Sequence, residues 1–258
     1  MNRINLLFDK KNKNIFSVFC TAGYPQLDKT VSILENLEKS GVDMIEIGMP
    51  FSDPTADGPV IQKSNTIAIE NGMTIETLFN QIKGIRKTIS IPLILMGYIN
   101  PAMQYGFERF LEIAANCGID GLIIPDLPLH EYEFFYKEMF EKYKLKCIFL
   151  ITPQTSEERI RKIDDLSNAF IYVVSTQSIT GGSGGFENEQ ALYFQRLKEM
   201  NLKNPCIVGF GIKDKATFEM ACSHLNGAII GSAFINTIEN STDLDTDILN
   251  FTKKIIQN

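Results

Sequence analysis

One stretch near the N-terminus reads DMIEIGMPFSDPTADGP from Asp43 to Pro59. Its apolar first part has the composition of a short buried strand, and its second part, rich in Pro, Asp and Gly, is typical of a loop. Glu46 lies inside the apolar part and Asp57 lies in the loop. Because burial raises the pKa of a carboxyl group, Glu46 is a candidate general acid or base near neutral pH. The alternative is a structural carboxylate paired with a neighbouring Lys or Arg.

Strand-like and helix-like segments alternate on both sides of this stretch. The apolar runs predict strands at residues 15–20, 44–47, 91–96, 121–124, 147–151, 170–174, 206–208 and 227–230. The helical patterns fall at residues 28–40, 61–70, 74–88, 107–116, 131–143, 156–166, 188–200, 214–223 and 245–256, with short helices expected at 1–11 and 233–238.

Eight strand–helix units predict an α/β fold in which the parallel strands close into a (β/α)8 TIM barrel with extra short helices. No Pro/Gly-rich linker divides the chain, so we expect a single TIM-barrel domain over residues 1–258. A doubly wound open sheet is the alternative. It is disfavoured because no G-x-G-x-x-G motif opens a helix near the N-terminus.

Composition excludes several classes of protein. The 258 residues carry a net charge of -6 and are 44% hydrophobic, which is ordinary for a globular protein and argues against a nucleic-acid partner. The apolar runs are too short to span a membrane, and the N-terminus has no signal-peptide core, so we expect a cytoplasmic location. The 5 cysteines and 2 histidines lack the spacing of metal ligands, and no metal site is expected.

The ends of the last three predicted strands are rich in glycine. They carry Thr180-Gly181-Gly182, Gly209-Phe210-Gly211 and Gly231-Ser232. In TIM barrels the loops after strands seven and eight, with the N-terminus of a short extra helix, commonly bind phosphate. Since no Lys or Arg falls in these turns, binding is expected to depend mainly on backbone dipoles. Tight turns without a ligand are the alternative, and the run 178–185 could act as a lid.

Aromatic side chains also occur at or near the predicted strand ends. Phe19, Tyr98, Tyr172 and Phe210 could line a pocket above the barrel and hold a flat apolar part of a substrate. Packing in the core is the alternative for each of them.

The run from Ile45 to Pro59 closely resembles the signature of tryptophan synthase α subunits. The resemblance continues through residues 125–128, 179–181, 209–212 and 231–233 and covers essentially the whole chain. It implies retro-aldol cleavage of indole-3-glycerol phosphate to indole and glyceraldehyde 3-phosphate, a step of L-tryptophan biosynthesis. The catalytic positions of the family fall on Glu46 and Asp57. A carboxyl group that protonates indole C3 and a second one near the indole N–H suit this chemistry.

The resemblance also implies substrate-binding positions and a partner. The phosphate site maps onto Gly181, Gly211, Gly231 and Ser232, next to Thr180, and the indole pocket maps onto Phe19, Ile61, Tyr98, Tyr172 and Phe210. The expected partner is a tryptophan synthase β subunit in an α-β-β-α heterotetramer, facing residues 50–58 and the segment at Asn100 and Pro101. Pyridoxal phosphate is expected only on that β subunit, and no cofactor is expected on this chain.

Three alternatives to an α subunit stay open at this point. One is a stand-alone indole-3-glycerol-phosphate lyase without a β partner. Another is a non-catalytic regulatory or scaffolding barrel, which the presence of both Glu46 and Asp57 argues against. The third is another phosphate-sugar aldolase or isomerase; a Schiff-base aldolase would need a Lys inside a strand, and none of the predicted strands contains one.

Overall fold

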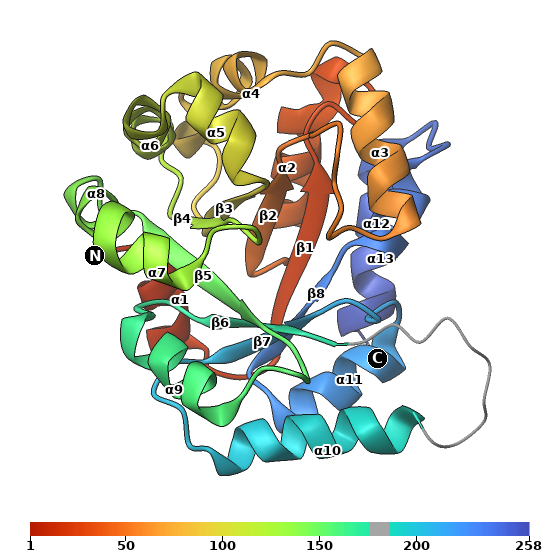
Figure 1. Cartoon of the computed structure of the whole chain (residues 1–258). Coiled ribbons are helices and arrows are strands. Elements are labelled where there is room, and N and C mark those ends of the chain that lie inside the picture. The colour runs from red at the N-terminus through yellow and green to blue at the C-terminus, as the bar shows by residue number, and fades with distance from the viewer. Residues whose placement is uncertain (176–185, 258) are drawn as a thin grey trace.

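The computed structural model describes residues 1–175 and 186–257, and the side chains of all of these except 186–189. Within this part of the chain, parallel strands β1 to β8 form a closed barrel in sequence order, and β8 pairs with β1 (Figure 1). The predicted (β/α)8 barrel is therefore confirmed. The strands are β1 Ile15–Thr21, β2 Met44–Gly48, β3 Leu93–Met96, β4 Gly121–Ile123, β5 Lys146–Ile151, β6 Ile171–Val174, β7 Cys206–Gly209 and β8 Gly227–Ile230.

The strands are apolar on both faces because one face fills the barrel and the other packs against helices. Every residue of β1 and of β2 is buried, Glu46 included. One strand departs from the sequence expectation: β5 begins at Lys146, so a strand does contain a lysine. Lys146 lies at the N-terminal end of its strand, opposite the end where TIM-barrel active sites form.

Helices surround the barrel, as Figure 1 shows. The α-helices are α1 Arg3–Lys10, α2 Thr30–Lys39, α3 Pro59–Glu70, α4 Ile75–Ile82, α5 Ile99–Tyr105, α6 Phe107–Asn116, α7 Leu129–Glu131, α8 Lys137–Lys142, α9 Glu157–Leu166, α10 Phe186–Glu199, α11 Lys215–His224, α12 Ser232–Ile238 and α13 Leu244–Ile256. Short turns of other helix types are η1 Leu27–Lys29, η2 Ile85–Lys87 and η3 Tyr132–Tyr136.

Two helical segments differ from the prediction. Residues 74–88 do not form one helix: α4 ends at Ile82, and η2 follows after Gly84, whose φ of 83° is left-handed and breaks the helix. Helix α5 was not predicted, because Pro101 lies in it. Pro101 falls in the first turn, where backbone N–H groups have no partner within the helix, so the proline is tolerated.

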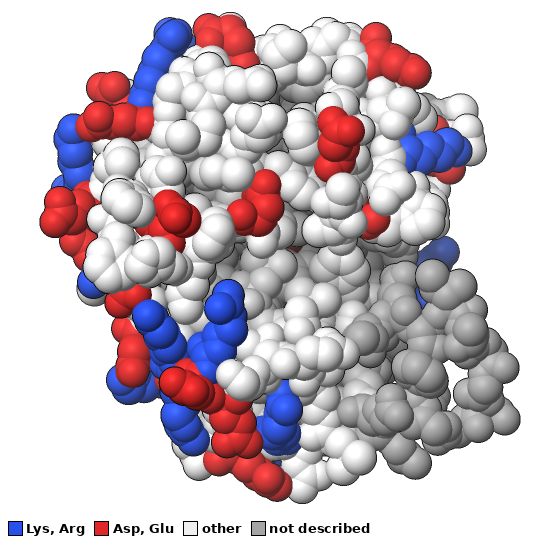
Figure 2. Space-filling view, viewed as in Figure 1, with Lys and Arg blue, Asp and Glu red and all other residues white. Residues whose placement is uncertain are grey.

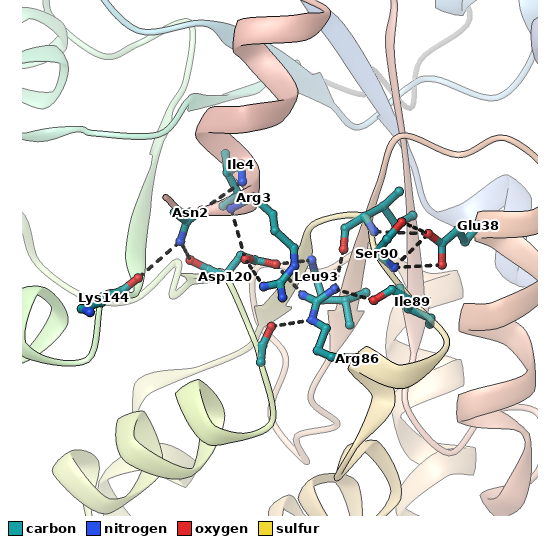
Figure 3. Close-up of polar contacts among 12 residues, drawn as sticks. Asn2, Arg3, Ile4, Glu38, Arg86, Ile89, Ser90, Leu93, Asp120 and Lys144 are labelled. Carbon is teal, nitrogen blue, oxygen red and sulfur yellow. Dashed lines mark hydrogen bonds and ion pairs between the residues drawn. The ribbon is translucent and has the colours of Figure 1, made fainter.

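The N-terminal end of the barrel is closed by α1 and a network of charged side chains (Figure 3). Asp120, just before β4, accepts hydrogen bonds from Arg3 Nη1 at 3.1 Å, from Arg86 Nη2 at 2.5 Å and from the Leu93 amide at 3.0 Å. Arg86 Nε donates to the Gly118 carbonyl at 2.8 Å. This network joins α1, the turn η2, the start of β3 and the loop before β4, and the short helix expected within residues 1–11 is confirmed.

Charged side chains on the surface do not separate by sign on the face that Figure 2 shows, where Lys and Arg lie among Asp and Glu. Among the residues that the structure describes, no helix is both long and apolar enough to cross a membrane.

Candidate active site

A cavity of about 650 Å³, open to solvent, lies at the C-terminal ends of the strands. Residues from the ends of β1, β3, β6 and β8 and from the loops after β2, β7 and β8 contribute to its wall. They are Phe19, Asp57, Ile61, Met96, Tyr172, Phe210, Gly211, Ile212, Lys213, Ile229, Gly231, Ser232 and Ala233. This is the end of a TIM barrel at which active sites form.

Glu46 lies in the barrel wall below this cavity. It is fully buried in β2, beside Phe19 of β1 in the strand register. Neither carboxyl oxygen has a hydrogen-bond partner in the part of the chain that the structure describes. Burial therefore raises the pKa of Glu46 to about 8. A carboxyl group in this setting is protonated at neutral pH, as a general acid requires.

Asp57 belongs to the loop between β2 and α3 and lines the cavity. Burial raises its pKa to about 6, and a hydrogen bond from the Tyr98 hydroxyl, 3.3 Å from Oδ2, opposes this rise. Asp57 is consequently ionised at neutral pH while Glu46 is protonated. Two carboxyl groups with separated pKa values can take different roles in one reaction.

Two aromatic rings of the cavity wall, those of Phe19 and Tyr172, each depend on a glycine. A Cβ atom at Gly48 would lie 2.4 Å from Phe19 Cζ, and one at Gly209 would lie 1.9 Å from the Tyr172 hydroxyl oxygen. Only glycine leaves room for these rings. Phe210 packs edge-on against Tyr172, with ring centroids 6.4 Å apart. Together these rings form an apolar slot.

The loop after β7 has an unusual backbone. Phe210 has a φ of 69° and Gly211 a φ of 73°, both in the left-handed region. A non-glycine residue is strained there, and such residues gather at functional sites. The Ser175 hydroxyl donates to the Phe210 carbonyl at 2.6 Å, which holds the turn in place. The turn directs Phe210 and Gly211 to the cavity.

The other predicted phosphate residues are only partly described. Gly231 and Ser232 line the cavity at the start of α12, beside Gly211. Thr180 and Gly181, and the predicted lid at residues 178–185, lie outside the residues that the structure describes. Of the predicted indole-pocket residues, Phe19, Ile61, Tyr172 and Phe210 line the cavity, whereas Tyr98 lines a smaller adjoining space next to Asp57.

Several cavity residues were missed by the sequence analysis. Lys213 is the most important, since it brings a cation to a site expected to depend mainly on backbone dipoles. It follows Gly211 by two positions, and that short spacing was the signal that could have found it. Met96, Ile212, Ile229 and Ala233 also line the cavity. These residues are apolar, as core residues are, so the sequence gives no signal that separates them from the core.

A model of the tryptophan synthase alpha chain family matches residues 7–257. The chain belongs to the tryptophan synthase alpha chain family. The tryptophan synthase alpha chain of Flavobacterium psychrophilum is 61% identical, over 92% of this chain and 94% of its own length. That of Christiangramia forsetii is 56% identical over 99% of this chain and 98% of its own length.

Solved structures of the tryptophan synthase family share the fold. A crystal structure of the alpha chain from Legionella pneumophila superposes with a TM-score of 0.88 at 34% identity, covering 99% of this chain and 96% of that one. Tryptophan synthase from M. tuberculosis in an aminoacrylate-bound form gives a TM-score of 0.86 at 26% identity, covering 99% of this chain and 98% of that one. Alpha chains are lyases of tryptophan biosynthesis, which places the buried carboxyl group and the glycine-rich turns in a biosynthetic enzyme family.

Proposed function

We propose that this chain catalyses the retro-aldol cleavage of indole-3-glycerol phosphate to indole and glyceraldehyde 3-phosphate. The observation that carries the proposal is the fully buried Glu46 carboxyl group, which has no hydrogen-bond partner among the described residues and lies below a cavity that Asp57 lines. Membership of the alpha chain family supports the same reaction.

Glu46 acts as the general acid and then as the general base. Its protonated carboxyl group delivers a proton to indole C3, which makes the ring a cationic indolenine. The resulting carboxylate takes the proton of the glycerol hydroxyl next to the scissile bond. As the aldehyde forms, the C–C bond breaks and its electron pair returns to the indole ring. Glu46 is fully buried and does not line the cavity, so proton transfer in this proposal requires its side chain to turn toward the bound substrate.

Asp57 stabilises the positive charge of the indolenine. An ionised carboxylate beside the indole N–H lowers the energy of this cation far more in a site that excludes water than in solution. Asp57 has the position for this role because it lines the same cavity as the aromatic rings of Phe19 and Tyr172. Its pKa of about 6 leaves it ionised at neutral pH.

The phosphate group binds in the same cavity, at the turns after β7 and β8. Gly211, Gly231 and Ser232 offer backbone N–H groups and a hydroxyl group, and Lys213 adds a positive charge at the mouth. A phosphate anchored there fixes the distance of the indole ring from the two carboxyl groups, which is how a remote group contributes to the rate of a reaction.

The partner is a tryptophan synthase β subunit, with which the chain forms an α-β-β-α assembly in the cytoplasm. The facing surface consists of the loop at residues 50–58 and the start of α5. Asp53, Thr55 and Ala56 are exposed on the loop, as are Asn100 and Met103 on α5. This chain carries no cofactor in the proposal, and pyridoxal phosphate belongs to the β subunit.

Indole release tests the partner as well as the reaction. The purified chain is assayed with indole-3-glycerol phosphate alone and with increasing amounts of a β subunit. Slow release alone and strong stimulation that saturates at equal amounts of the two chains are expected. Fast release without stimulation would replace the proposal with a stand-alone lyase. The absence of indole under both conditions would favour a non-catalytic barrel.

A further inference from the structure

The hydroxyl group of Tyr98 makes two hydrogen bonds to the loop that carries Asp57. It accepts a hydrogen bond from the Ala56 backbone N–H at 2.8 Å and lies 3.3 Å from Asp57 Oδ2, to which it donates. One hydroxyl thus holds both the main chain and the side chain at the same point of the loop. Such a pair of bonds limits rotation at the backbone and at the carboxylate together.

Tyr98 is itself held from two directions. The residue is only 6% exposed, and its ring packs against Phe51, at the start of the loop that carries Asp57, with centroids 5.2 Å apart. The next residue, Ile99, donates its backbone N–H to Asp126 Oδ1 at 2.9 Å, which anchors the start of α5 to the loop after β4. The hydroxyl group therefore has a fixed position, and its hydrogen bonds can hold the loop that carries Asp57 in one conformation.

We propose that Tyr98 is a positioning residue for Asp57, whose hydroxyl group fixes the carboxylate toward the cavity through both hydrogen bonds. This role differs from the indole contact expected of Tyr98, because the residue lies outside the wall of the main cavity. The inference depends on the proposed function, in which the Asp57 carboxylate stabilises the indolenine cation. Loss of the hydroxyl would leave the carboxylate free to turn away and less favoured in its ionised form.

The titratable groups around Asp57 determine how a substitution at Tyr98 would change the pKa of Asp57. Tyr98 contacts the carboxylate directly, and Tyr172 and Lys213 line the same cavity. Glu46 raises the pKa of Tyr172 together with Asp57, after the larger effect of burial. Of these groups, Tyr98 is the one that donates a hydrogen bond to Asp57, and its removal raises the Asp57 pKa further above the normal carboxyl range.

Tyr98→Phe is the test, because it removes the hydroxyl and keeps the ring against Phe51. Tyr105→Phe is the matched control: it removes a hydroxyl from the other end of α5, where Tyr105 bonds to the exposed Glu76. The Asp57 pKa is measured by ¹³C NMR of the side-chain carboxyl carbon, assigned with Asp57→Asn. We expect Tyr98→Phe to raise this pKa by roughly 0.5–1 pH unit and Tyr105→Phe to leave it unchanged.

Two further measurements separate positioning from a general loss of structure. Hydrogen exchange of the Ala56 amide should accelerate in Tyr98→Phe alone. The acid limb of the pH profile of kcat/KM should move up by the same amount as the Asp57 pKa, so the loss of activity is about threefold to tenfold below pH 6 and smaller at pH 8.5. An unchanged Asp57 pKa, or an equal loss at every pH, would overturn the inference. If the wild-type chain released no indole, the proposed function would fail, while the NMR titration would still decide the role of Tyr98.

Discussion

The hydroxyl oxygen of Tyr172 occupies the space that a Cβ atom at Gly209 would need, since the two atoms would lie 1.9 Å apart. Tyr172 comes from β6 and Gly209 ends the neighbouring strand β7, with which β6 pairs in parallel. The cavity wall therefore depends on Gly209, a residue that does not itself line the cavity.

Gly209→Ala should displace the Tyr172 ring and lower kcat/KM by tenfold or more. Tyr172→Leu removes the ring, so Gly209→Ala should cost much less in that background, and the two changes should be strongly non-additive. Rates of indole release by the two single variants and the double variant give the coupling. Simple multiplication of the two losses would show that the ring and the glycine act independently.

Glu46→Gln should stabilise the protein at alkaline pH while abolishing its activity. The folded-state pKa of about 8 lies above the ordinary glutamate value of 4.5, so the folded state holds a proton that the unfolded state loses. Stability is thus lost as the pH rises from about 4.5 to 8, by about 3–5 kcal/mol. Glutamine is neutral at every pH and escapes this loss.

Urea unfolding at pH 4.5 and pH 9 measures the effect on stability, with the exposed Glu70→Gln as the control. The stability advantage of Glu46→Gln should be present at pH 9 and absent at pH 4.5. Equal stabilities of Glu46→Gln and wild type at pH 9 would mean that Glu46 has a normal pKa.

Lys213→Gln should raise KM for indole-3-glycerol phosphate by about threefold to tenfold with little change in kcat, because an exposed cation strengthens phosphate binding equally before and during the reaction. The KM of the wild type should rise with salt concentration more steeply than that of the variant. Lys198→Gln on the outer helix α10 is the control. If Lys213→Gln left KM unchanged at low salt, phosphate binding would depend on backbone dipoles and not on Lys213.

Asp120→Ala should destabilise the fold by about 3–5 kcal/mol, because it leaves the largely buried Arg86 without the carboxylate that balances its charge at the N-terminal end of the barrel. The KM of the folded fraction should stay unchanged, since this network lies at the end of the strands away from the cavity. Asp165→Ala, which breaks an exposed ion pair with Lys203, should have little effect on stability. Thermal melts measure the loss of stability, and kinetics below the melting temperature measure KM. A raised KM would mean that Asp120 also affects substrate binding.

The sequence predicted the barrel well because the fold depends on local patterns. Runs such as 15–20 and 206–208 are apolar on both faces, and Gly, Pro and Asp mark their ends. The break at Gly84 and the extra helix α5 were missed because both depend on one residue in a particular backbone position. Local composition does not specify such a position.

The candidate site was predicted less completely. Glu46 stood out because a carboxylate inside an apolar strand is rare, and Asp57 because it follows in the same stretch. The role of Tyr98 could not be predicted, because its hydroxyl reaches Ala56 and Asp57 about 40 residues away in sequence. Lys213 was overlooked because an exposed lysine in a loop looks like any solvated charge.

Indole release from indole-3-glycerol phosphate, by the wild type and by Glu46→Gln in the presence of a β subunit, tests the central claim most directly. The account predicts rapid release by the wild type and none above background from Glu46→Gln, with Glu70→Gln as active as the wild type. Release by Glu46→Gln at a rate near that of the wild type would contradict the assignment of proton transfer to the buried carboxyl group.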